Sequence, residues 1–234
     1  MEEQSYADIS GGQVTTMKPI LFNTDMVRAI LEGRKTVTRR VIKDKDIVNA
    51  WDCESDGTPI AFVDQATGDS HPPTFTCQYQ PGDILYVRET FTYVPGGSCV
   101  YKASVECPDA WKGTWHPSIH MPKEVARLFL RVTDVRAERL QKMTIEDFQK
   151  EGIKREEAHA YGCRCQWATE TCLEKPCSNR DAYEYLCWAP QFKKLWDSTI
   201  DPLYLDLYAW KANPWVWVIS FERISREEAE RTGT

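Results

Sequence analysis

The sequence contains no run of about 18 apolar residues, the length that a membrane-spanning helix requires. Its first 16 residues are polar and acidic and lack the apolar stretch of a secretory signal. No internal repeat, low-complexity tract or clear linker divides the chain. We therefore expect a cytoplasmic monomer with no membrane partner, consisting of a disordered leader over residues 1–16 and one domain over residues 17–228.

Basic residues are fewer than acidic ones. The chain has 29 Lys and Arg residues and 35 Asp and Glu residues, which gives a formal net charge of −6. Strong binding to long duplexes without regard to sequence needs a broad basic face. The charge balance argues against that mode of binding but allows a local basic pocket. Histidine is rare, and His71, His116 and His120 show no recognisable ligand or triad spacing.

Aromatic residues are plentiful, with nine Trp among 234 residues. Extra Trp usually fills a core, but it also supplies surfaces on which a base can stack. Tyr86, Trp115 and Trp215 are candidates for stacking, and each also suits a core position. A chain of this length buries a core without disulfide staples.

Hydrophobic patterns predict short strands and helices in alternation. A strand over residues 19–22 precedes a helix capped by Asn23 or Thr24 and ended by Gly33. A second short helix runs from Thr144 to Gly152. The other predicted elements are strands after residues 81–83, over 99–106, 126–140 and 214–224, and a helix over 190–200. This pattern predicts an α+β fold, a small β-barrel with flanking short helices and loop-rich insertions at about residues 44–80 and 154–190.

The stretch "LEGRKTVTRRVI" places Lys35 and Thr38 just past the predicted end of the first helix. Basic residues there often only complement the helix dipole. A desolvated Lys can instead lose its proton near neutral pH and activate a hydroxyl, provided that a carboxylate orients it. Glu89 and Glu151 are the candidate carboxylates. Glu89 follows Arg88 and could form a structural ion pair with it, and Glu151 could be a solvated helix residue.

The motif "GRKTVTRR" matches the G-x-K-x-x-T-x-R signature of ASCH domains, which are PUA-like. The stretches "PGDILYVRETF", "LRVTDVRAERLQKMTIEDFQKEGI", "FKKLWDS" and "NPWVWVISFERI" also resemble those of the longer, phage-associated members. The resemblance covers about residues 18–224 and breaks in the insertions. It implies a PUA-like barrel. It departs from the small bacterial members in that this chain is about twice as long and carries a Cys-rich insertion after Glu151.

Small bacterial ASCH members remove the acetyl group from N4-acetylcytidine, and a Lys–Thr–Glu triad is proposed for them. The resemblance places this triad on Lys35, Thr38 and Glu151, and the signature arginine on Arg40. Thr38 would attack the acyl carbon while neutral Lys35 takes its proton, although Lys35 itself could be the nucleophile. Arg40 would bind an oxyanion or a phosphate. We expect the substrate-binding residues to be Arg39, Arg40, Tyr86, Arg88, Glu89 and Trp215.

The resemblance also leaves other functions open. Some members are thought only to bind nucleic acid, so a non-catalytic reader of single-stranded RNA or modified DNA is the alternative to an amidohydrolase acting on a modified nucleoside or nucleotide. Ribonuclease activity is a third, weaker option. The acidic net charge favours a small ligand over a long polymer.

Four cysteines in "CRCQWATETCLEKPC" have the spacing C-x-C-x6-C-x4-C. Four thiolates so close together could hold a structural zinc ion, which implies Cys163, Cys165, Cys172 and Cys177 as ligands. The C-x-C start is not the usual zinc-knuckle spacing, and unligated or disulfide-paired cysteines are the alternative. No cofactor is expected for catalysis.

Overall fold

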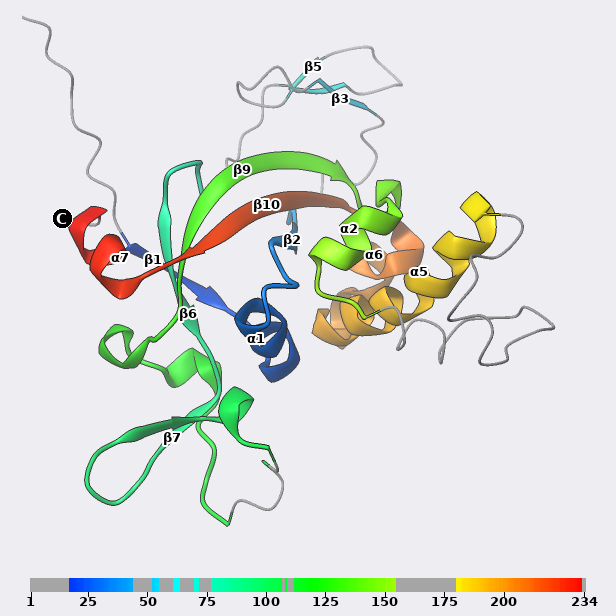
Figure 1. Cartoon of the computed structure of the whole chain (residues 1–234). Helices are drawn as coiled ribbons and strands as arrows, with labels where there is room; N and C mark the ends of the chain where they lie inside the picture. Colours follow the sequence, from blue (N-terminus) through cyan, green and yellow to red (C-terminus); the bar gives the residue numbers. More distant parts are fainter. Residues whose placement is uncertain are drawn as a thin grey trace, which may run out of the picture.

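The computed structural model describes residues 17–43, 52–54, 61–63, 70–71, 77–106, 108, 112–154 and 180–232. Figure 1 shows two long curved strands, β9 (Phe129–Arg139) and β10 (Trp215–Ile224), that arch over helix α1 (Thr24–Leu31). Helices α2 (Ile145–Lys150), α5 (Arg180–Thr199) and α6 (Leu205–Tyr208) gather at one end of this arch.

A five-stranded sheet forms the centre of the fold, in the order β1-β6-β9-β10-β2. Its other three strands are β1 (Met17–Leu21), β2 (Val37–Val41) and β6 (Ile84–Arg88). β1 and β6 are parallel, and the remaining pairs are antiparallel. The predicted α+β class is therefore confirmed. Backbone pairing among the described residues does not close the sheet, so β1 and β2 are its edges.

Two smaller sheets and several single turns complete the described elements. The smaller sheets contain β3 (Asp52–Glu54), β4 (Ala61–Val63) and β5 (Ser70–His71), and β7 (Phe91–Tyr93) with β8 (Cys99–Tyr101). Short 3-10 turns lie at Lys102–Ser104, Ser118–His120, Lys123–Val125, Leu140–Lys142, Pro202–Tyr204 and Trp210–Ala212. Helix α7 (Arg226–Thr232) follows β10.

Both predicted helix caps are confirmed. The Asn23 side chain accepts a hydrogen bond from the Met26 N–H at 2.9 Å and begins α1. Thr144 begins α2 in a capping box with Asp147, in which each side chain accepts from the other's backbone N–H. Glycines with positive φ end both helices, at +73° for Gly33 and +93° for Gly152.

The two faces of the sheet carry separate apolar clusters. α1 packs on one face, where Ile20, Val27 and Leu130 are among the buried residues. α2 and α5 pack on the other face, against Val216 and Val218. Neighbouring residues of a strand point to opposite faces. Consecutive positions of β2 therefore contribute to different layers, and this alternation positions the site.

Four sequence predictions need correction. The insertion at 44–80 contains three short paired strands, because isolated pairs of β residues carry little periodic signal. α5 begins at Arg180, inside the stretch predicted to be irregular up to residue 190. The strand predicted over 99–106 ends at Tyr101 and continues as a 3-10 turn. The stretch after Gly33 is an edge strand, β2, and not only a helix end.

Within the described part of the chain, no helix is both long and apolar enough to cross a membrane.

Candidate active site

The end of α1 places Lys35 in the interior. Gly33 turns the chain back, so that the backbone N–H groups of Arg34 and Lys35 both donate to the Ala29 carbonyl, at 2.9 and 3.0 Å. Lys35 then forms an isolated antiparallel bridge with Glu151, the last residue before Gly152. The backbone after Gly33 is thereby held between α1 and the end of α2.

The ammonium group of Lys35 is fully enclosed, because its side chain has 0% exposure and that of Glu151 has 4%. Nζ donates to the Val37 carbonyl at 2.8 Å, to the Glu151 carbonyl at 3.2 Å and to Glu151 Oε2 at 2.5 Å. An ammonium has three N–H donors, so these acceptors satisfy all of them. The structure therefore unites two of the three predicted triad residues in a buried, charge-assisted contact.

The second carboxylate oxygen of Glu151 binds a different cation. Arg39 Nη1 donates to Glu151 Oε1 at 3.0 Å, while the rest of the Arg39 guanidinium contacts Glu138 at 2.6 Å and Asp147 at 3.3 Å. Arg39 thus holds three carboxylates from β9, α2 and the residue after α2. It fixes the position of Glu151 from the side opposite Lys35, so its role is to position the triad.

Burial is the main electrostatic influence on the site. It lowers the pKa of Lys35 below its usual value of 10.5, because desolvation disfavours the charged amine. Glu151 opposes this shift, and Arg40 and Arg39 add to it. Burial also disfavours the charged form of Arg39, but Glu151, Glu138 and Asp147 outweigh it and raise its pKa. A Lys with a lowered pKa is closer to the neutral form that a general base requires.

Asp147 links the Arg39 cluster to the cap of α2, and this link gives a pH-dependent prediction. Burial would raise the pKa of Asp147, but hydrogen bonds from Thr144 and the charge of Arg39 lower it overall. A carboxyl whose folded pKa is lowered contributes stability above its usual value of 3.8, and that stability is lost as the pH falls through the folded pKa.

We therefore expect Asp147→Asn to destabilise the protein by about 1 kcal/mol at pH 7. The difference in urea midpoint between wild type and variant should shrink as the pH is lowered below 3.8. A difference that stays constant from pH 7 to pH 3 would show that the Asp147 charge contributes nothing.

Thr38 and Arg40 lie on the face of β2 opposite to Arg39. Thr38 is 1% exposed and pairs with Ile219 of β10. It directly follows Val37, whose carbonyl accepts from the Lys35 ammonium. Arg40 donates to the Leu21 carbonyl at 2.8 Å, and its guanidinium carbon lies 5.3 Å from the centre of the Phe22 ring.

The Phe22 ring lies close to two cations, Lys35 and Arg40. The Lys35 ammonium lies 5.8 Å from the same ring centre that Arg40 covers. The Arg40 hydrogen bond to Leu21 also connects β2 to the end of β1, the opposite edge of the sheet. Lys35, Glu151 and Arg39 are thus joined by hydrogen bonds, and Thr38 and Arg40 lie beside them on β2.

A hollow of about 510 Å³ runs along the open edge of β2 beside this group. Arg39, Arg40 and Lys43 line it together with Tyr79 and aromatic residues of α5 and β10. Trp217 is the residue that the sequence analysis missed, since Trp215 was chosen in its place. Trp217 lies directly opposite Arg40 in the β10–β2 register. The alternation of "WVWV" could have signalled a shared face, but the pairing partner was needed to choose between the two.

Four predicted substrate-binding residues lie elsewhere. Arg88 donates to the carbonyls of Met121, at 2.9 Å, and Ile119. Glu89 is 1% exposed and accepts two hydrogen bonds from Arg127, at 2.8 and 3.0 Å. Arg88 and Glu89 therefore both have structural hydrogen-bond partners. The carboxylate that contacts Lys35 is that of Glu151 and not that of Glu89.

The two aromatic residues among these four, Tyr86 and Trp215, do not line the hollow. Tyr86 packs in a cluster with Phe129 of β9. Trp215 is 3% exposed, with the Arg139 guanidinium 4.7 Å from its ring centre. Both serve as packing residues in this structure.

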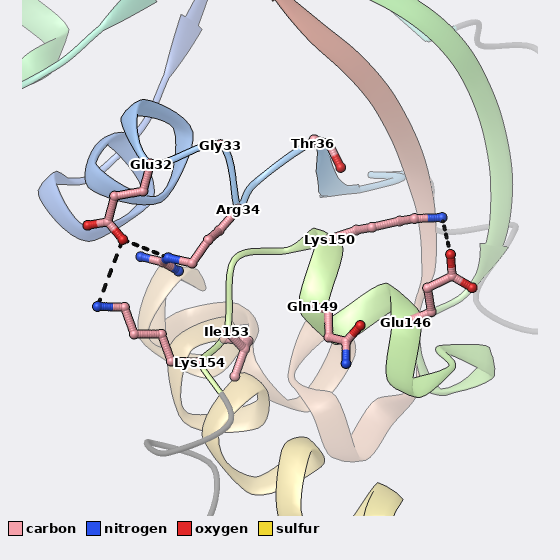
Figure 2. A pocket seen from close by; sticks show the side chains of 9 residues that line it. All are labelled: Glu32, Gly33, Arg34, Thr36, Glu146, Gln149, Lys150, Ile153 and Lys154. Carbon is pink, nitrogen blue, oxygen red and sulfur yellow. Dashed lines mark hydrogen bonds and ion pairs between the residues drawn. The ribbon is translucent and has the colours of Figure 1, made fainter.

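A second hollow, of about 640 Å³, lies between the end of α1 and α2 (Figure 2). It carries charges of both signs. Glu32 contacts Arg34 at 2.7 Å and Lys154 at 3.9 Å, and Lys150 contacts Glu146 at 2.9 Å. Each of its three cations has a carboxylate within 4.0 Å, although Arg34 and Lys154 share that of Glu32.

The predicted zinc ligands Cys163, Cys165, Cys172 and Cys177 lie outside the described residues. Among the residues that the structure does describe, no group of three His, Cys, Asp or Glu side chains is placed to hold a metal ion. The zinc site therefore stays a prediction from the sequence.

No protein-family model, curated protein or solved structure matches this chain.

Proposed function

We propose that this chain is an amidohydrolase that removes an acyl group from N4-acylated cytosine nucleosides or nucleotides. The observation that carries the proposal is the buried contact of 2.5 Å between Lys35 and Glu151, next to the Thr38 position of β2. Titratable groups that are desolvated and specifically paired are typical of catalytic sites. The resemblance of "GRKTVTRR" to ASCH domains supplies the reaction class.

The mechanism follows from the roles that these groups can fill. Lys35 acts in its neutral form, which its lowered pKa makes more accessible, and Glu151 holds it in place. The Thr38 hydroxyl then attacks the acyl carbon while Lys35 takes its proton. Lys35 returns this proton to the exocyclic nitrogen as the C–N bond breaks, which releases the deacylated nucleoside or nucleotide and leaves an acyl ester on Thr38. Water then hydrolyses the ester, which releases the carboxylic acid and restores the Thr38 hydroxyl.

Arg40 is suited to bind an anionic group of the substrate. It lies on the same face of β2 as Thr38, two residues along the strand. Its guanidinium is partly buried, and a donor in a water-poor site binds an anion more strongly than one in water. Arg39 would act through Glu151, which it holds by one carboxylate oxygen.

The proposal includes a PUA-like fold. The five-stranded sheet has the strong curvature seen in Figure 1, and the Arg40 side chain spans its two edge strands. A small barrel requires the edge strands β1 and β2 to approach one another. The hydrogen bond from Arg40 of β2 to Leu21 of β1 therefore supports a PUA-like barrel.

A second candidate function is binding without chemistry, as a reader of modified bases in single-stranded nucleic acid. The observation that favours it is the enclosure of the triad, because the Lys35 side chain has no exposed surface and Thr38 is 1% exposed. Catalysis requires that a substrate in the hollow reach Thr38 and Lys35, so the edge of β2 would have to open. Binding without chemistry requires only that the hollow itself be accessible.

The test is hydrolysis of N4-acetylcytidine, followed by loss of the ultraviolet band of its amide. We expect wild-type turnover to rise with pH, with a midpoint below 10.5, because the neutral form of Lys35 is required. Thr38→Val should remove turnover, whereas Thr38→Ser, which keeps a hydroxyl, should retain part of it.

Circular dichroism would confirm that both Thr38 variants are folded. Equal turnover in Thr38→Val and wild type would overturn the assignment of the nucleophile. No turnover by the folded wild type would favour the reader.

A further inference from the structure

The hollow beside β2 differs in charge from the rest of the molecule. Its lining contains three basic residues, Arg39, Arg40 and Lys43, and no acidic residue. The chain as a whole has a net charge of −6. The hollow of Figure 2 is similar in size but mixes Glu32 and Glu146 with its cations. The β2 hollow is thus a local basic pocket on an acidic protein.

Two of these three cations form no ion pair with a carboxylate of the described residues. Arg39 already forms ion pairs with three carboxylates. Within the described ranges, no carboxylate lies within ion-pair distance of Arg40 or Lys43. Arg40 has five N–H donors, and its contacts there are the Leu21 carbonyl at 2.8 Å, a long contact of 3.5 Å to its neighbour's carbonyl, and the Phe22 ring.

A desolvated cation without an anion is unfavourable. Burial lowers the pKa of Arg40 overall, and the charge of Glu151 only partly opposes this shift. An anionic ligand group that enters the hollow would supply the missing charge, and Lys43, which is exposed, would add a second cation at the mouth. Phosphate and carboxylate are the groups that a guanidinium binds best.

The aromatic lining narrows the class of ligand. Trp217 is only partly buried, and its side chain shares a face with the Arg40 side chain directly opposite. Tyr79 also lines the hollow, and its hydroxyl already donates to the Pro19 carbonyl at 2.8 Å. An indole face next to uncompensated cations suits a ligand that has both a flat base and an anionic group.

Size and net charge favour a small ligand over a polymer. A volume of about 510 Å³ lies within the range of about 300–1,000 Å³ that is typical of small-molecule sites. A long polyanion would meet the acidic remainder of the surface.

We infer that the β2 hollow binds the phosphate of a cytosine nucleotide through Arg40 and Lys43, with the base against Trp217. The substrate of this site is then a nucleoside monophosphate rather than a free nucleoside. The choice of cytosine rests on the proposed function, whereas the phosphate site rests on the charges of the hollow alone.

The experiment compares the binding of cytidine 5′-monophosphate, cytidine and inorganic phosphate by calorimetry at low ionic strength. None of these probes carries an acyl group, so the result does not depend on turnover. We expect the monophosphate to bind about 10- to 100-fold tighter than cytidine, the effect of one or two hydrogen bonds to a charged group. Inorganic phosphate should bind more weakly than the monophosphate because it lacks the base.

Lys43→Ala is the test variant, and Lys150→Ala is its matched control. Lys150 lines the mixed-charge hollow of Figure 2 and is paired with Glu146. Both changes remove one positive charge from the same protein. The preference for the monophosphate should fall at least about threefold in Lys43→Ala and persist in Lys150→Ala.

Three results would overturn the inference. They are equal affinity for cytidine and its monophosphate, an undiminished preference in Lys43→Ala, and inorganic phosphate binding as tightly as the monophosphate. Binding of a short oligocytidine more than tenfold tighter than the monophosphate would overturn the choice of a single nucleotide. A monophosphate preference that needs Lys43, found in a protein without hydrolysis, would sustain the phosphate site while the proposed function fails.

Discussion

Replacing Lys35 by methionine is expected to lower turnover of N4-acetylcytidine by about 10²- to 10⁴-fold, the usual contribution of a general base. Methionine has a similar length and fills the same buried space without a charge. The change should also reduce the free energy of unfolding by about 3 kcal/mol, as expected when one partner of a buried ion pair is removed. The loss lies at the lower end of the usual range because Glu151 keeps its hydrogen bond from Arg39.

The double variant Lys35→Met/Glu151→Met separates the catalytic loss from the structural one. It removes both buried charges, and Arg39 keeps Glu138 and Asp147 as partners. We expect its free energy of unfolding to return to within about 1 kcal/mol of wild type, since replacing both partners of a buried pair by apolar groups is often nearly neutral. Its turnover should stay lost.

Urea unfolding of the wild type, both single variants and the double variant gives the coupling energy of the pair. Lys150→Met, in the exposed pair with Glu146, serves as a control that should change stability by less than about 0.5 kcal/mol. Additive effects in the cycle would contradict the buried contact between Lys35 and Glu151. Wild-type turnover in a folded Lys35→Met variant would contradict the role of Lys35 as the base.

Gly152→Ala is expected to destabilise the protein by about 3 kcal/mol. The φ of Gly152 is +93°, where an L residue is strained by about 1–2 kcal/mol. A Cβ at this position would also lie 2.7 Å from the Ala29 Cβ and 3.2 Å from the Lys35 Cβ. Overpacking of this kind adds about 1–3 kcal/mol. Because both neighbours belong to rigid parts of the site, the Glu151–Lys35 contact should be displaced as well.

Gly33→Ala is the matched control for this change. Gly33 also has a positive φ, +73°, but a Cβ there meets no heavy atom within 4 Å. The Gly33→Ala change should therefore lower the free energy of unfolding only by the conformational strain, about 1 kcal/mol. Thermal unfolding of the two variants measures the difference. Equal losses would mean that the close approach of Gly152 to Ala29 and Lys35 has no energetic consequence.

Local signals in the sequence were sufficient for the short helices. Asn23 and Thr144 are good caps, and Gly33 and Gly152 are good stops, because each acts on backbone groups within a few residues. The long strand β9 was also predicted, since Leu128, Leu130 and Val132 alternate. In contrast, the pair Lys35–Glu151 joins residues 116 positions apart. The residues alone left Glu89 and Glu151 as candidate partners of Lys35, and the resemblance to ASCH domains favoured Glu151.

Other parts of the site had no local signal. Nothing in the stretch "YVRET" distinguishes a Glu89 that binds Arg127 from one that binds Lys35. The choice between Trp215 and Trp217 depended on which of them lies opposite Arg40 in the sheet. β2 was not predicted as a strand, because its Thr and Arg residues hide the alternation that buried edge strands usually show.

The sequence by itself determined the helix ends, the α+β composition, the acidic net charge and the position of the "GRKTVTRR" motif at the end of α1. These properties depend on composition and on contacts between near neighbours in the chain. The tertiary structure alone decided that Glu151 meets Lys35, that Arg39 and Arg40 point to opposite faces of β2, and that Arg40 and Lys43 line a hollow without acidic residues. These facts depend on strand order, register and burial, which arise only when distant segments pack together.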